Sequence, residues 1–168
     1  MIFLQNRVNA QSVLCGSSFG DPVFTEDFGS TPNPYPTVAG PLNSSNASTT
    51  YQYKNSFPPD DGFYTISNST NPKSSGFSWI TSLDHTANPS GTYGNMLVVN
   101  ASYSPGEFYR RKVTGLCPNQ VYRFSVWVLN ICTPGNNLKK PDITLNIQDK
   151  DGKKLGTVSS GKIDADEK

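Results

Sequence analysis

The alternation of apolar and polar side chains predicts a chain built from short β-strands. It is most regular in residues 121–131, where the even positions from Tyr122 to Val128 form one apolar face. Residues 23–28 and Asp142–Gln148 alternate in the same way. Successive side chains of a strand point to opposite faces, so each stretch predicts a strand with one face turned to a core.

Apolar runs and turn residues predict the remaining strands. Met96–Asn100 is apolar on both faces, which favours a buried strand. Shorter strands are expected at residues 51–53, 63–66, 77–80, 107–113 and 154–158. Pro and Gly in residues 58–62 predict a turn, and Asp151-Gly152 favours a type I′ hairpin turn. No stretch of twelve residues has a 3.6-residue apolar period, so we expect an all-β sandwich or barrel.

Composition narrows the class of protein. The chain has 168 residues, enough for one domain, of which 35% are hydrophobic and only 16% charged. A net charge of +1 gives no reason to expect a nucleic-acid partner or an anionic membrane surface. No apolar run approaches the roughly 18 residues of a membrane span. The polar, loop-rich composition is typical of a secreted or cell-surface β domain.

Both ends of the chain lie outside the expected β domain of residues 13–161. Residues 1–12 look like the end of a signal peptide, with small residues at Val8-Asn9-Ala10, or else like a disordered leader. Residues 162–168 form a polar tail without a closing strand. A sandwich without that strand has an unpaired edge and uncovered apolar surface, so we expect a domain truncated at its C-terminus.

The three cysteines, Cys15, Cys117 and Cys132, match no zinc or redox spacing. If one strand joins Cys117 to Cys132, their Cα atoms lie about 40 Å apart at about 3.3 Å per residue. A disulfide spans at most ~7 Å between Cα atoms, so these two should not pair. Cys15 is left to pair with either of them, or with a cysteine outside this chain.

The sequence offers no catalytic motif. His85 is the only histidine, and on a strand its neighbour Asp84 would point to the opposite face. The G-x-S-x-G and H-E-x-x-H patterns are both absent. We therefore predict no catalytic residues and no enzyme. A glycan-active hydrolase is the alternative, because carboxylates such as Asp60 and Glu107 could form an acid pair.

Two kinds of binding site are compatible with the residues. Calcium prefers oxygen ligands on loops, which Glu26, Asp27 and Asp84 could supply. The alternative is that Asp84 and Asn88 cap turns. Trp127 alternates away from the apolar face of residues 121–131, on the same side as Arg123. With Tyr109 these side chains could stack on a sugar, and the alternative is that Trp127 belongs to the core.

Five stretches together resemble a known type of domain. They are "CGSSFGDPVFTEDFG", "YQY" followed by "DDGFYTISNST", "DHTANPSGTYGNMLVVNAS", "PGEFYRRKVTGLCPNQVYRFSVWVLNI" and "PDITLNIQDKDGKKLGT". In this order, over residues 15–161, they are similar to a domain of large secreted and cell-surface proteins of Bacteroidetes. Those proteins often end in gliding-motility or type IX secretion sorting domains.

The resemblance implies a jelly-roll β-sandwich of two antiparallel sheets, similar to carbohydrate-binding modules and galactose-binding-like domains. It implies that closing C-terminal strands follow the region present here. The expected function is a non-catalytic extracellular binding or adhesion module, most simply for a polysaccharide or surface glycan, beside other domains of a parent protein. The alternative is a structural spacer without a ligand. By resemblance Glu26, Asp27 and Asp84 hold a structural Ca²⁺, and Trp127, Arg123 and Tyr109 contact the sugar.

Overall fold

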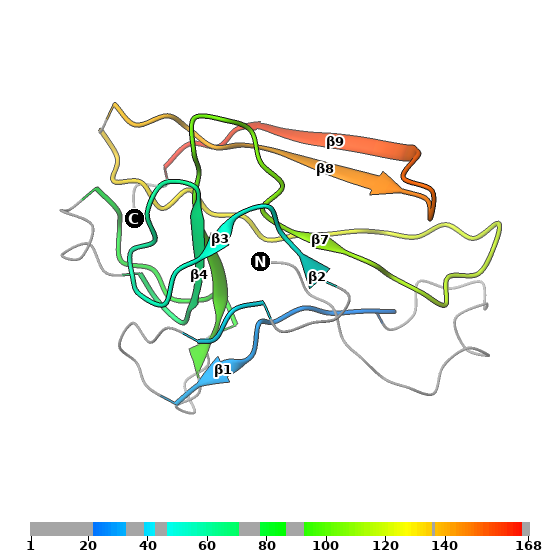
Figure 1. The fold of residues 1–168 in the computed structure, drawn as a ribbon, viewed down its shortest axis with the longest axis horizontal. Helices are drawn as coiled ribbons and strands as arrows, with labels where there is room; N and C mark the ends of the chain where they lie inside the picture. Colours follow the sequence, from blue (N-terminus) through cyan, green and yellow to red (C-terminus); the bar gives the residue numbers. More distant parts are fainter. Residues whose placement is uncertain are drawn as a thin grey trace.

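The computed structural model describes residues 22–32, 39–42, 47–70, 78–86, 93–135 and 137–165. These residues contain strands and no helix, which confirms the all-β class (Figure 1). The strands are β1 Ser30–Thr31, β2 Ala47–Ser48, β3 Gln52–Tyr53, β4 Phe63–Ser67, β5 Tyr93–Gly94, β6 Met96–Asn100, β7 Arg110–Arg111, β8 Asp142–Gln148 and β9 Lys154–Lys162.

The centre of the molecule is the sheet β3-β4-β6. β4 pairs parallel with β3 and antiparallel with β6, in a register that places Tyr64 opposite Val99 and Ile66 opposite Leu97. Tyr64, Ile66 and Val98 are buried. The prediction of a strand at Met96–Asn100 is confirmed with the same bounds. Aromatic and β-branched side chains suit this position because both faces of β4 are covered.

A polar continuation of β4 positions the loop that carries Asp84. Ser69 forms a bridge with Leu83, and the amide of Asp84 donates to the carbonyl of Asn68 over 3.1 Å. The hydroxyl of Thr70 donates to the carbonyl of Ile80 over 2.6 Å. These side chains are small and polar, yet buried, because they satisfy the backbone where the ladder ends.

A second pairing fixes the end of residues 121–131. Trp79 forms a bridge with Cys132, the amide of Ile80 donates to the carbonyl of Ile131, and the amide of Thr133 donates to the carbonyl of Ser78, both over 2.8 Å. The segment that holds Trp127 is therefore tied to the segment that leads to Asp84 and His85.

Small antiparallel pairs complete the periphery. β1 pairs with β5, and β2 pairs with β7. Several antiparallel sheets are thus present, and the jelly-roll arrangement of two complete sheets stays a prediction.

β8 and β9 form the hairpin expected from the sequence, and β8 has the predicted bounds. The predicted turn type is wrong. Gly152 has a φ of 83°, whereas Asp151 is not among the residues with positive φ, so this is no type I′ turn. The carboxylate of Asp149 accepts from the amides of Asp151 and Lys153, both over 2.9 Å, and fixes a longer loop.

Three predicted strands, at residues 23–28, 77–80 and 121–131, are not formed among the described residues; of residues 78–80, only Trp79 forms a bridge. Residues 23–28 and 121–131 have no strand assignment, and Val126 is a single bridge residue within the second segment. Phe124 and Val128, expected on the core-facing side, are exposed. Alternation predicts a strand only where a neighbour completes the hydrogen-bond ladder, and the described residues supply none here.

The cysteines behave as expected in one respect. Cys132 is a free thiol, whereas Cys117 is disulfide-bonded, so the prediction that these two do not pair is confirmed. Cys15 lies outside the described residues, as does the 1–12 leader.

Candidate functional site

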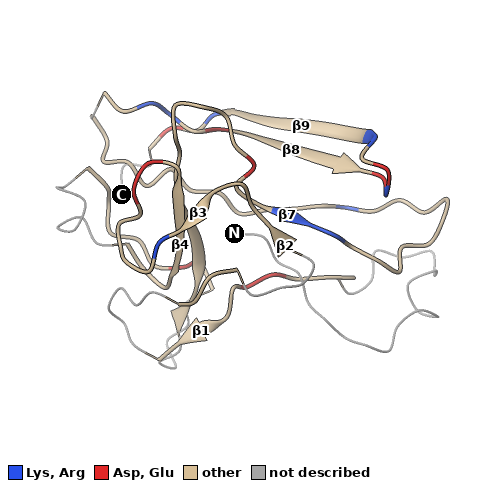
Figure 2. Cartoon of the chain, in the orientation of Figure 1, with Lys and Arg blue, Asp and Glu red and all other residues tan. Residues whose placement is uncertain are grey.

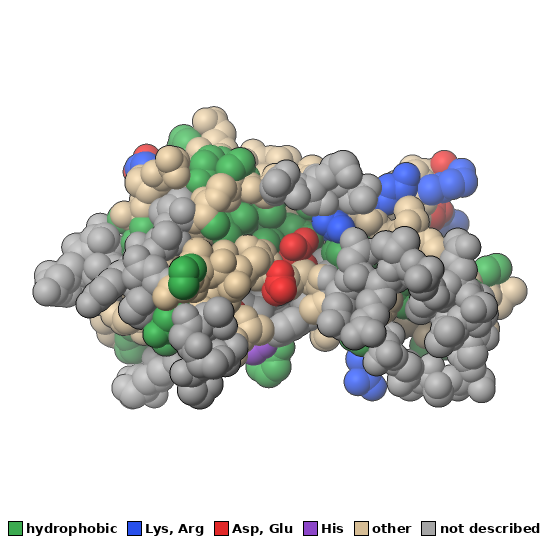
Figure 3. Space-filling view, turned by 90° about the horizontal axis from the view of Figure 1, so that it is seen from below, with side chains coloured by type: hydrophobic (Ala, Val, Ile, Leu, Met, Phe, Trp, Pro, Cys, Tyr) green, Lys and Arg blue, Asp and Glu red, His purple; other side chains and the backbone are tan. Residues whose placement is uncertain are grey.

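An exposed tryptophan is the most distinctive feature of the surface. Trp127 is 60% exposed, and its ring lies 4.9 Å from the ring of His85, centroid to centroid, at an interplanar angle of 32°. In the space-filling view histidine, in purple, lies against an exposed hydrophobic side chain (Figure 3). The alternative that Trp127 belongs to the core is wrong. Packing against His85 holds one side of the indole and leaves the other open to solvent.

The sequence did not predict the contact between Trp127 and His85. It arises because residues 78–80 pair with residues 131–133, which brings two distant segments together. Arg123 is exposed on the same segment as Trp127. The structure thus brings Trp127 and His85 together on one candidate surface, which we call the Trp127 platform.

Tyr109 lies in a different environment. Its hydroxyl donates to Glu26 Oε2 over 2.7 Å, and its ring packs edge-on against Phe28 at 5.9 Å. Burial and the hydrogen bond to Glu26 raise the pKa of Tyr109 far above its ordinary value. Tyr109 is therefore held by a partly buried carboxylate, an interaction that differs from the predicted stacking on a sugar.

Glu26 lies at the centre of this second cluster. Arg111 Nη1 is 3.6 Å from Glu26 Oε2, and the Arg111 guanidinium lies 4.3 Å from the centroid of the Phe24 ring. Both side chains are largely buried, where an unpaired charge would be costly, and each charge compensates the other. Glu26 also lines a cavity of about 340 Å³ with Phe28 and Ile66. In the space-filling view, acidic side chains lie in front of hydrophobic ones in a hollow of this face (Figure 3).

Asp27 and Asp84 both fix turns. Asp27 Oδ1 accepts from the amide of Gly29 over 2.9 Å. Asp84 Oδ2 accepts from the amide of Thr86 over 3.0 Å and from the Thr86 hydroxyl. The carboxylate of Asp84 packs on Gly94, where a Cβ would collide with it. The turn-capping alternative from the sequence is therefore realised for Asp84, and its second residue, Asn88, lies outside the described residues.

The three predicted calcium ligands do not form one site. Among the described residues there is no group of three His, Cys, Asp or Glu side chains suited to a metal. Asp84 nevertheless has one carboxylate oxygen, Oδ1, that accepts no hydrogen bond, although the residue is only 3% exposed. The distance from His85 Nδ1 to this oxygen is 3.9 Å. Asn95, next to Gly94, also has an unpartnered buried side-chain oxygen. Both are oxygen atoms of the kind that a hard cation prefers.

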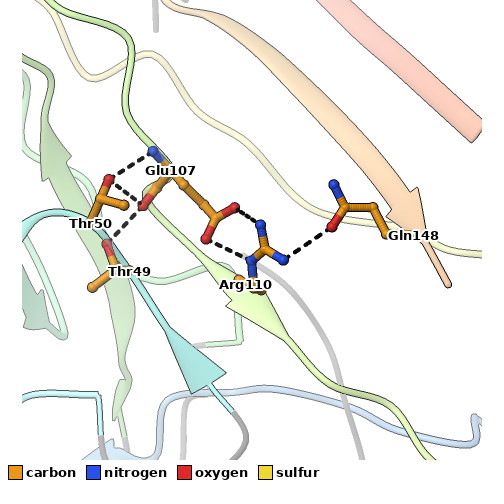
Figure 4. A network of polar contacts seen from close by, with 5 residues as sticks. All are labelled: Thr49, Thr50, Glu107, Arg110 and Gln148. Carbon is orange, nitrogen blue, oxygen red and sulfur yellow. Dashed lines mark hydrogen bonds and ion pairs between the residues drawn. The ribbon is translucent and has the colours of Figure 1, made fainter. Parts of the chain in front are cut away.

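A polar network ties the β8–β9 hairpin to the rest of the molecule (Figure 4). Arg110 donates to both Glu107 oxygens, over 2.8 and 2.6 Å, and to Gln148 Oε1 over 3.0 Å. The hydroxyls of Thr49 and Thr50 donate to the Glu107 carbonyl over 3.0 and 3.2 Å. The bonds from Arg110 lower the pKa of Glu107.

The fold and these sites define an all-β domain with an exposed aromatic platform. Comparison with models of protein families, with curated proteins and with solved structures finds no match to this chain. The resemblance to Bacteroidetes surface domains therefore stays a prediction. Across the part of the chain that the structure describes, no helix is long and apolar enough to span a membrane.

Proposed function

We propose that this chain is a non-catalytic carbohydrate-binding or adhesion module of a larger secreted or cell-surface protein. The observation that carries the proposal is the exposure of Trp127, 60% of whose surface is open to solvent. Leaving a large aromatic side chain exposed forgoes the free energy of its burial. Trp127 differs from the other strongly exposed aromatic side chain of the described residues, Tyr103, in that the aromatic ring of His85 packs against it.

The platform suits a sugar for physical reasons. A pyranose presents an apolar face of C–H groups that packs on an indole plane, while its hydroxyls need polar partners at the edge. His85 holds the indole in place, so less side-chain entropy is lost on binding. We expect Arg123, which is exposed on the same segment as Trp127, to contact sugar hydroxyls beside the indole.

A structural Ca²⁺ is part of the proposal, narrowed to Asp84 with amide and backbone oxygens as further ligands. It would stabilise the loop that carries His85, and hence the Trp127 platform. The test compares thermal unfolding in Ca²⁺ and in EDTA for the wild type and Asp84→Asn. Stabilisation by about 2.7 kcal/mol is expected at a hundredfold excess over Kd, and only in the wild type. Equal melting of the wild type in both solutions would remove calcium from the proposal.

Affinity electrophoresis against a panel of soluble polysaccharides tests the binding function. The wild type should be retarded by at least one polysaccharide, and Trp127→Ala should lose at least tenfold in affinity, as at other buried aromatic contacts. Tyr103→Ala is the matched control, because Tyr103 is also a highly exposed aromatic residue. If no polysaccharide retards the wild type, the spacer function is favoured. If a polysaccharide is shortened during incubation, the hydrolase is favoured.

A further inference from the structure

No described strand pairs with the outer edge of β9. β9 is the longest strand of the described residues, with nine residues from Lys154 to Lys162, and it pairs only with β8. All nine residues are exposed, including Leu155 at 65% and Val158 at 67%. The hairpin runs along one side of the molecule, with β9 outermost (Figure 1). An unpaired strand of this length is a template for one more strand.

Part of one face of the β8–β9 hairpin is also exposed. Val158 lies opposite Leu145, so both side chains point to the same face of the hairpin. Leu145 is half-buried, whereas Val158 is exposed. A two-stranded sheet is marginally stable by itself, and a third strand would pair the free edge and cover Val158.

The charges on β9 indicate which kind of strand could pair with its outer edge. β9 has a lysine at each end and no acidic residue, and Lys153 precedes it in the turn. None of these three lysines makes an ion pair with another described residue. At the tip of the hairpin, basic and acidic residues of the loop lie side by side along the chain (Figure 2). In an antiparallel pair with a second copy, the lysines at the ends of the two β9 strands would come close together, which disfavours self-association.

We propose that the outer edge of β9 accepts a β-strand from a partner polypeptide that carries carboxylates near both ends and apolar residues in between. Backbone hydrogen bonds along the edge supply the affinity, the central apolar side chains cover Val158, and the carboxylates pair with Lys154 and Lys162. This docking edge is independent of the carbohydrate site, so either can fail without the other.

Nine-residue peptides of alternating Thr and Val, with Glu, Gln or Lys at both ends, provide the test. Binding of labelled peptides to the full chain is measured by fluorescence anisotropy at low salt. The Glu-ended peptide should bind about tenfold more tightly than the Lys-ended one, because two exposed charge pairs change sign. The double variant Lys154→Glu/Lys162→Glu should reverse this order. Alternate amides of a β-strand point to opposite edges of the peptide. N-methylation of the amides that face β9 should abolish binding, whereas N-methylation of the amides on the other edge should leave binding unchanged.

Three outcomes would overturn the proposal. The first is that no peptide binds while circular dichroism shows the hairpin folded. The second is a preference that the charge reversal leaves unchanged. The third is sedimentation showing that the wild type dimerises and that Val158→Asp makes it monomeric, which would assign the edge to a second copy.

Discussion

Replacement of Gly94 by alanine is the sharpest test of the packing that positions the platform. A Cβ at Gly94 would collide with Asp84 Oδ2 and Thr86 Oγ1, and would lie 3.1 Å from Asp84 Cγ. Asp84 is 3% exposed, so its carboxylate cannot swing into solvent without breaking the turn that holds His85. Either the methyl group or the carboxylate must be displaced.

The expected loss of stability follows from two contributions. Overpacking costs about 1–3 kcal/mol, and loss of the hydrogen bond from the Thr86 amide adds roughly 1 kcal/mol. The Tm should fall by roughly 5–10 °C for a chain of this size. Urea unfolding measures the free energy of unfolding directly. Gly156→Ala is the control, because nothing lies within 4 Å of its Cβ, and it should change stability by less than about 0.5 kcal/mol.

A double-mutant cycle separates this packing from a general effect of the substitution. In a background that carries both Asp84→Ala and Thr86→Ala, treated as one change, the added methyl group occupies space that the carboxylate and the threonine hydroxyl have vacated. Gly94→Ala should then cost less than about 1 kcal/mol, a clear departure from additivity. Full additivity, or a Gly94→Ala variant as stable as Gly156→Ala, would refute the packing of Asp84 on Gly94.

Further predictions concern the titratable groups. Because the folded-state pKa of Tyr109 is raised, its contribution to the free energy of unfolding is present below the ordinary pKa of 10.0 and is lost at higher pH. Ultraviolet difference titration should show one tyrosine that ionises only on unfolding. The Tyr109→Phe variant should lack this tyrosine signal. Because the pKa of Glu107 is lowered, its contribution to the free energy of unfolding is present above the ordinary pKa of 4.5 and is lost as pH falls through the folded-state pKa. The difference in Tm between the wild type and Arg110→Met should therefore narrow as pH falls through this range. A difference that stays constant would contradict the role of the ion pair. Burial raises the pKa of the Cys132 thiol, so its reaction with a disulfide reagent at neutral pH should be slow until urea is added, and immediate reaction would place it at the surface.

The sequence predicted those strands whose signal is local. Met96–Asn100 and Asp142–Gln148 have the expected bounds, because apolar runs and alternation between turn residues determine a strand wherever a partner is close. The turn in residues 58–62 is also confirmed, with Gly62 at a φ of 81° and the amide of Phe63 donating to the carbonyl of Asp60 over 3.0 Å.

What depends on distant partners could not be predicted. Residues 121–131 have the clearest alternation, yet they form no strand because no described segment completes their ladder. Trp127 was correctly placed away from the core, but its contact with His85 depends on the pairing of Trp79 with Cys132. Likewise, Arg111 was missed as the partner of Glu26, because nothing near either residue in the sequence indicates an ion pair between them.

Quenching of tryptophan fluorescence tests the carbohydrate-binding function most directly. The chain has two tryptophans, of which Trp79 is 9% exposed and Trp127 is 60% exposed, so an aqueous quencher reports mainly on Trp127. A polysaccharide that retards the protein in affinity electrophoresis should protect this fluorescence, and Trp127→Phe should abolish the effect. Retardation with unchanged quenching would show that the glycan binds elsewhere and would contradict the assignment of Trp127 as the sugar-binding platform.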